Sequence, residues 1–125
     1  MNLEQRCEAI EECYEFMLAY AAQGLTTEGG QIRQFLSQAA AALAGISEAC
    51  AEEQVTRSFA SVVERDAESS LAAIELVLAQ PAISSQLIDN LNASIHLRAL
   101  LTDLFLIDEV LKLQQQSSAQ ASTNH

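Results

Sequence analysis

Three cysteines, Cys7, Cys13 and Cys50, are the residues with the widest possible chemistry in this 125-residue chain, from metal binding to disulfide formation. Metal ligands on one helix stand three or four residues apart, whereas Cys7 and Cys13 are six apart and so lie on nearly opposite helix faces. An odd cysteine count, with no secretory signal expected after Met1, favours reduced thiols over a disulfide framework. We therefore expect packing residues, no metal, no cofactor and a cytoplasmic location.

Carboxylates offer a second possible chemistry, because four glutamates repeat at steps of three and four near the N-terminus: Glu4, Glu8, Glu11 and Glu15. This spacing places them on one face of a helix, where they could hold a metal or act as acids and bases. No histidine lies among them, and the Glu-x-x-His pairs of ferritin-like bundles are absent from the sequence. We predict a solvated acidic face available to a basic protein partner. A metal-binding or metal-storage bundle is a further alternative, tested by metal content after purification.

His96 carries the sharpest alternative, because phosphotransfer domains present a phosphorylatable imidazole midway along a helix of a small acidic bundle. The residues around it read SIHLRAL. They lack the Lys and small residues that usually follow such a histidine, and also the acidic residue and proline of histidine-kinase dimerisation helices. Phosphotransfer through His96 is therefore the alternative hypothesis, and unchanged labelling of His96→Gln by a phosphodonor would reject it.

The charge balance limits the possible partners. Seventeen acidic and six basic residues give a net charge of −11, which repels phosphate backbones and anionic membrane surfaces. The longest apolar stretch, residues 99–113, is interrupted by Asp103, Asp108 and Lys112, so no membrane-spanning helix is expected. Gly29-Gly30 lacks the spacing and the Lys of a phosphate loop. With His125 at the end of a polar tail, one usable imidazole remains, and we predict that the chain is not an enzyme.

The elements that position these residues are predicted to be helices throughout, because apolar residues recur at helical spacing on both sides of the only proline, Pro81. We predict an all-α, antiparallel four-helix bundle as a single domain over residues 1–113, with a disordered polar tail over 114–125. A threonine should cap the second helix, and Pro81 with Ser84-Ser85 should begin the fourth. The four predicted helices cover Leu3 to Ala22, Gln31 to Gly45 or about Ala51, the vicinity of Val55 to Ala79, and Ser84-Ser85 to about Gln115.

Two polar residues, Asp66 and Ser70, fall on the apolar face of the third predicted helix. Either Asp66 pairs with an arginine such as Arg33, Arg65 or Arg98, or the apolar stripe tilts out to solvent there. We favour the tilt.

The fourth predicted helix bears most directly on function, since it is apolar nearly all round between Ile95 and Leu113. A second copy of the chain is the favoured cover, because symmetric homodimers are the commonest oligomers. A different protein, or a central position of this helix in a monomer, are the alternatives. We predict a non-enzymatic helical protein–protein interaction module, an adaptor, anti-activator or chaperone-like regulator, acting as a homodimer. Its predicted interface comprises Leu97, Leu100, Leu101, Leu104, Phe105, Ile107 and Leu111.

Overall fold

The structure is a computed structural model, and it describes residues 1–23, 26–27 and 30–123. Over these residues the fold is helical, which confirms the all-α class. The helices are α1 (Leu3–Gln23), α2 (Gln31–Leu43), α3 (Ile46–Glu52), α4 (Ala60–Leu78), α5 (Ser85–Ala93) and α6 (Ile95–Thr123), with a 3₁₀ turn η1 (Arg57–Phe59). Two short strands, β1 (Thr26–Thr27) and β2 (Ile83–Ser84), pair antiparallel and join the α1–α2 and α4–α5 connections.

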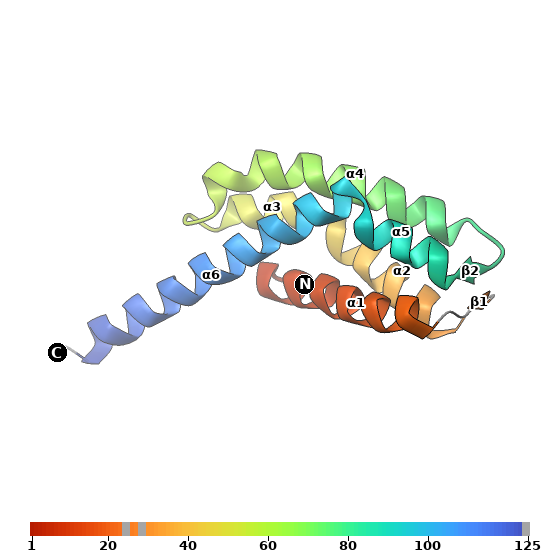
Figure 1. Cartoon of the computed structure of the whole chain (residues 1–125). Coiled ribbons are helices and arrows are strands. Elements are labelled where there is room, and N and C mark those ends of the chain that lie inside the picture. Colours follow the sequence, from red (N-terminus) through yellow and green to blue (C-terminus); the bar gives the residue numbers. More distant parts are fainter. Residues whose placement is uncertain (24–25, 28–29, 124–125) are drawn as a thin grey trace.

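The helices pack around α1 and α4. Helix α1 lies against α2 and α5, and α4 lies against α2, α3 and α6. Helix α6 begins beside α4 and α5, crosses the molecule and extends beyond the other helices, so that its C-terminal end stands apart from them (Figure 1). The C-terminal half of α6 is consequently covered on fewer sides than its N-terminal half.

Two of the predicted helices are each broken in two. Gly45, in the left-handed conformation with φ 93°, separates α2 from α3, so the second predicted helix ends there, the earlier of its two possible ends. Ser94 separates α5 from α6, and its hydroxyl accepts a hydrogen bond from the Leu97 N–H at 3.2 Å. No glycine or proline marks that break in the sequence. Helix α6 continues to Thr123, past the predicted end and through most of the predicted tail.

The predicted caps are partly right. Ser84 caps α5, where its side chain accepts a hydrogen bond from the Leu87 N–H at 3.0 Å. Pro81 lies in the loop before β2 instead of the first turn of a helix. Gly30, with φ 82°, takes the cap position of α2, whereas Thr26 and Thr27 form β1, so the predicted threonine cap is wrong. Gly24 and Gly29 lie outside the described residues.

The core contains all three cysteines as free, buried thiols. Burial raises the pKa of Cys7 and of Cys13 to about 12, and that of Cys50 to about 11. A thiol with so high a pKa stays protonated at neutral pH and is a poor nucleophile. Steps of three and four from Leu3 predict that Tyr14 lies on the inward face of α1. Tyr14 is only half-buried, whereas Cys13 and Tyr20 belong to the buried face.

Three of the six basic residues close helix C-termini. Arg6 Nη1 donates to the carbonyls of Ala42 at 2.9 Å and Ala44 at 2.6 Å, at the end of α2. Arg33 Nη1 donates to the Leu78 carbonyl at the end of α4, and Arg57 Nε donates to a carbonyl of the last turn of α3. Guanidinium groups here satisfy carbonyls that have no partner within the helix and oppose the negative end of its dipole.

Arg6→Ala should therefore lower the free energy of unfolding by about 2 kcal/mol, because it removes charge-assisted hydrogen bonds to the half-buried carbonyl of Ala42 and the exposed carbonyl of Ala44. Urea denaturation followed by circular dichroism measures the change. Arg65→Ala, at an exposed site on α4, is the matched control and should change the same quantity by less than about 0.5 kcal/mol. Equal effects of the two substitutions would contradict the capping role.

Candidate functional site

The inner face of α6 belongs to the core of the chain itself. Its members are buried by the other helices: Leu97, Leu100, Leu101, Leu104 and Ile107. Leu111 is half-buried, and of the seven predicted interface residues only Phe105 is exposed. The predicted interface is thus corrected. Five of its side chains stabilise the monomer, because α4, α5 and α1 cover the face that the sequence could not assign to any neighbour.

The outer face of α6 remains uncovered and is also apolar. Among the described residues, eight large apolar side chains are exposed, and four of them lie on this face. Thr102 and Glu109 are exposed polar residues among them, and the exposed Arg98 and Lys112 lie along the same face. Steps of three, four and seven place the four apolar residues, Thr102 and Glu109 on one side of the helix. We call this surface the outer strip: Ile95, Thr102, Phe105, Leu106, Glu109 and Leu113.

Two hollows border the outer strip. The first, of about 270 Å³, is lined by five apolar residues and one threonine: Val55, Thr56, Phe59, Leu106, Ile107 and Val110. The second, of about 380 Å³, lies over the first two turns of α6 and is lined by Ala93, Ile95, Arg98, Ala99 and Thr102. Both hollows could receive side chains of another protein segment lying along α6.

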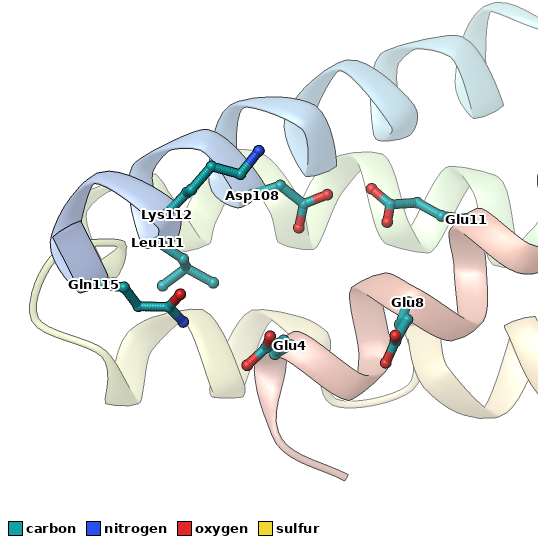
Figure 2. A pocket seen from close by; sticks show the side chains of 7 residues that line it. All are labelled: Glu4, Glu8, Glu11, Asp108, Leu111, Lys112 and Gln115. Atoms are coloured by element: carbon teal, nitrogen blue, oxygen red, sulfur yellow. The ribbon is translucent and has the colours of Figure 1, made fainter.

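An acidic cleft lies between α1 and the C-terminal half of α6 (Figure 2). It measures about 270 Å³ and is lined by Glu4, Glu8, Glu11, Asp108, Leu111, Lys112 and Gln115. Glu4, Glu8 and Glu15 are exposed, as predicted, but Glu11 is half-buried and its carboxyl group points toward that of Asp108 (Figure 2). The predicted solvated stripe is therefore corrected at Glu11, because α6 packs over this part of α1.

Glu11 and Asp108 form a carboxyl pair joined by a side-chain hydrogen bond. Burial raises the pKa of Glu11 to about 8, together with this hydrogen bond and the negative charges of Asp108, Glu15 and Glu8. The raised pKa favours a proton shared between α1 and α6. Without it, two like charges would face each other across the helix contact.

A second carboxyl pair joins α4 to α6. Asp103 is only 6% exposed and is hydrogen-bonded to Asp66, while its Oδ2 has no hydrogen-bond partner among the described residues. Burial raises the pKa of Asp103 to about 7, followed by the hydrogen bond and the charge of Asp66. Each pair contains one residue of α6, Asp103 or Asp108, and these two are five residues apart. The pairs link α6 to α4 and to α1.

The prediction that the apolar stripe of α4 tilts out to solvent at Asp66 and Ser70 is wrong, because α6 packs against α4 there. Ser70 is fully buried and its hydroxyl donates to the His96 carbonyl at 2.9 Å, and Asp66 is half-buried. The partner of Asp66 is another carboxyl group, and none of the three arginines that we considered. The signal available in the sequence was the position of Asp103 and Asp108 within the mostly apolar run 99–113. Acids inside a buried stripe need a partner that can share a proton.

The remaining predicted chemistry stays separate from these surfaces. The imidazole of His96 is exposed on the first turn of α6. Over the described ranges, His, Cys, Asp and Glu side chains form no group of three that could hold a metal ion. No helix within the same ranges has the length and apolar character needed to span a membrane.

No model of a known protein family matches the chain, and neither the curated proteins nor the solved structures contain a significant match to it.

Proposed function

We propose that this protein is a non-enzymatic helical protein–protein interaction module, of the adaptor, anti-activator or chaperone-like kind, that acts as a homodimer through the outer strip of α6. One observation carries the proposal: half of the exposed large apolar side chains of the described residues gather on one face of one helix. Exposed apolar side chains scattered singly are ordinary, whereas a contiguous group of them marks an interaction surface.

Charge supports the outer strip as the self-association surface. Two chains of net charge −11 repel each other, so they associate most easily through a face that carries little net charge. The outer strip contains one acid, Glu109, and is flanked by the exposed cations Arg98 and Lys112. The acidic cleft is left free in such a dimer and is suited to a basic segment of a further partner.

The proposal includes an antiparallel bundle of four units: α1, α2 followed by α3, α4, and α5 followed by α6.

Three buried, unpaired thiols suit a reducing compartment, and we place the protein in the cytoplasm on that ground. Neither a cofactor nor a nucleic acid is part of this proposal.

Phe105→Glu with Leu106→Glu should convert the dimer to a monomer, because both charges would be buried against a second outer strip. Light scattering behind size exclusion should give twice the chain mass of 13.5 kDa for the unmodified protein and the single mass for the variant. Leu76→Glu is the matched control, since Leu76 is an exposed apolar residue on α4, away from the outer strip. A single-chain mass for the unmodified protein across a concentration series would reject the dimer, and a double mass for the variant would reject the outer strip as its interface.

Phosphotransfer remains the alternative function, and the observation in its favour is the exposure of the His96 imidazole. Incubation with a small phosphodonor should label the unmodified chain and not His96→Gln if this hypothesis is right. Equal labelling of the two chains, or none, rejects it.

A further inference from the structure

We propose that the second copy lies on the outer strip with its α6 antiparallel to the first, about a two-fold axis that passes close to Phe105 and Leu106. This inference rests on the proposed homodimer and adds the direction, the register and the contacts of the pairing. The outer strip itself supplies the argument, because its two ends differ in shape and in charge.

The shapes of the two ends are complementary only when the helices run in opposite directions. The N-terminal end contains the exposed Ile95, followed by the small side chains Ala99 and Thr102 within the second hollow. The C-terminal end projects two exposed leucines, Leu106 and Leu113. Antiparallel pairing places Leu106 of each chain over the small residues Thr102 and Ala99 of the other, as side chains of one helix fill gaps on the next, and sets Leu113 against the exposed Ile95. Parallel pairing would place leucines against leucines and hollow against hollow.

The register follows from matching these ends. If Thr102 faces the partner's Leu106, then Ile95 faces the partner's Leu113, and the two-fold axis crosses α6 at the level of residue 104. Phe105 then lies beside the axis and meets the partner's Phe105. In this register Ile95, Phe105 and Leu113 each face an apolar residue of the partner, and Leu106 packs over the partner's Thr102.

The charges independently favour the same register. Arg98 precedes the level of residue 104 by six residues and Glu109 follows it by five, so Arg98 and the partner's Glu109 differ by about 1.5 Å along the helix axis. Arg98 and Glu109 are eleven residues apart, about three turns, and therefore lie on the same side of α6. A two-fold axis perpendicular to the helices brings that side of one chain to the same side of the other.

Two Arg98–Glu109 ion pairs would thus form, one at each end of the dimer interface. Both residues are exposed, and neither is in an ion pair or side-chain hydrogen bond within the described part of the chain. Parallel pairing would instead set Arg98 level with the partner's Arg98 and Glu109 level with the partner's Glu109, so neither would meet an opposite charge and the ion pairs would not form.

A charge-swap series tests the register. Arg98→Glu and Glu109→Arg should each weaken the dimer by about tenfold or more, since each places like charges together twice per dimer. The double variant Arg98→Glu/Glu109→Arg should recover the dimer to within about threefold of the unmodified protein. Dissociation constants are measured by sedimentation equilibrium at low salt, with Arg65→Glu on α4 as the control. A double variant that is no stronger a dimer than either single variant overturns the antiparallel register.

Disulfide trapping tests the direction separately. Under antiparallel pairing, an oxidised mixture of Thr102→Cys and Leu106→Cys chains should form the mixed disulfide dimer faster than either chain links to its own kind. Under parallel pairing each variant should link fastest to its own kind, and that result would overturn the inference. The native cysteines are buried and should not compete.

These tests separate the inference from the proposed function. If the unmodified chain is a monomer, both fail. If Phe105→Glu/Leu106→Glu dissociates a dimer but the charge swap does not restore association, the outer strip remains the interface and only the antiparallel pairing is rejected.

Discussion

Leu104→Ala should lower the free energy of unfolding by about 3 to 5 kcal/mol, among the largest effects that a single substitution in this chain can have. Leu104 is 0% exposed and lies on the face of α6 that packs into the core. Truncation removes its apolar contacts and leaves a cavity that the surrounding helices fill only in part. Urea denaturation followed by circular dichroism measures the loss.

The neighbouring residue provides the control. Phe105 is 55% exposed on the outer strip, so Phe105→Ala should change the unfolding free energy of the monomer by less than about 0.5 kcal/mol. Phe105→Ala should instead lower the mass given by light scattering at concentrations where the unmodified chain is a dimer. The comparison is made at concentrations where light scattering gives the single-chain mass, because dimer formation stabilises the folded chain by mass action. If Leu104→Ala instead dissociated a dimer without loss of monomer stability, Leu104 would be an interface residue, as the sequence alone suggested.

Asp103→Asn should raise the free energy of unfolding at about pH 8 by about 1 to 2 kcal/mol and leave it unchanged below about pH 4. The pKa of Asp103 is raised from its ordinary value of 3.8 to about 7 in the folded chain. Between these values the unfolded chain loses the proton and the folded chain keeps it, so folding becomes less favourable as the pH rises from about 4 to about 7. Above about pH 7 both states are ionised and the loss is complete. We expect less than the full linkage value, because water reaches part of the pair.

The asparagine amide reproduces the protonated carboxyl group, since it can donate to the Asp66 carboxylate without carrying charge. Glu11→Gln should act in the same direction, because the pKa of Glu11 is raised from 4.5 to about 8 against Asp108. The double variant should therefore have the flattest dependence of stability on pH. Thermal unfolding over a pH series measures it.

Glu12→Gln, at an exposed position on α1, is the control for the loss of one negative charge. Its stability curve should run parallel to that of the unmodified protein. If the Asp103→Asn curve did the same between about pH 5 and pH 8, the carboxyl pair would not share a proton as we describe.

Several local features could be predicted from the sequence, because they depend only on neighbouring residues. Ser84 caps a helix because its hydroxyl satisfies an N–H within the same turn, and such contacts depend only on neighbouring residues. Gly45 ends α2 because a left-handed residue is needed there and glycine adopts that conformation without strain. Leu3, Cys7, Ile10 and Met17 recur at steps of three and four, a spacing that indicates one helix face, and all four are buried. The break at Ser94 escaped prediction, since serine is equally acceptable within a helix and at its start.

Side-chain spacing, caps and charge count were enough to predict the helical class, several helix ends and the acidity of the chain from its sequence. Which face of α6 is covered depends on how the other helices pack against it. Leu104 and Phe105 are adjacent and similarly apolar, and periodicity gives their angles around the helix without naming a neighbour. The carboxyl pairs, Asp103 with Asp66 and Asp108 with Glu11, likewise depend on the tertiary structure. Each joins helices far apart in the chain, and a contact of that kind exists only once the helices have packed.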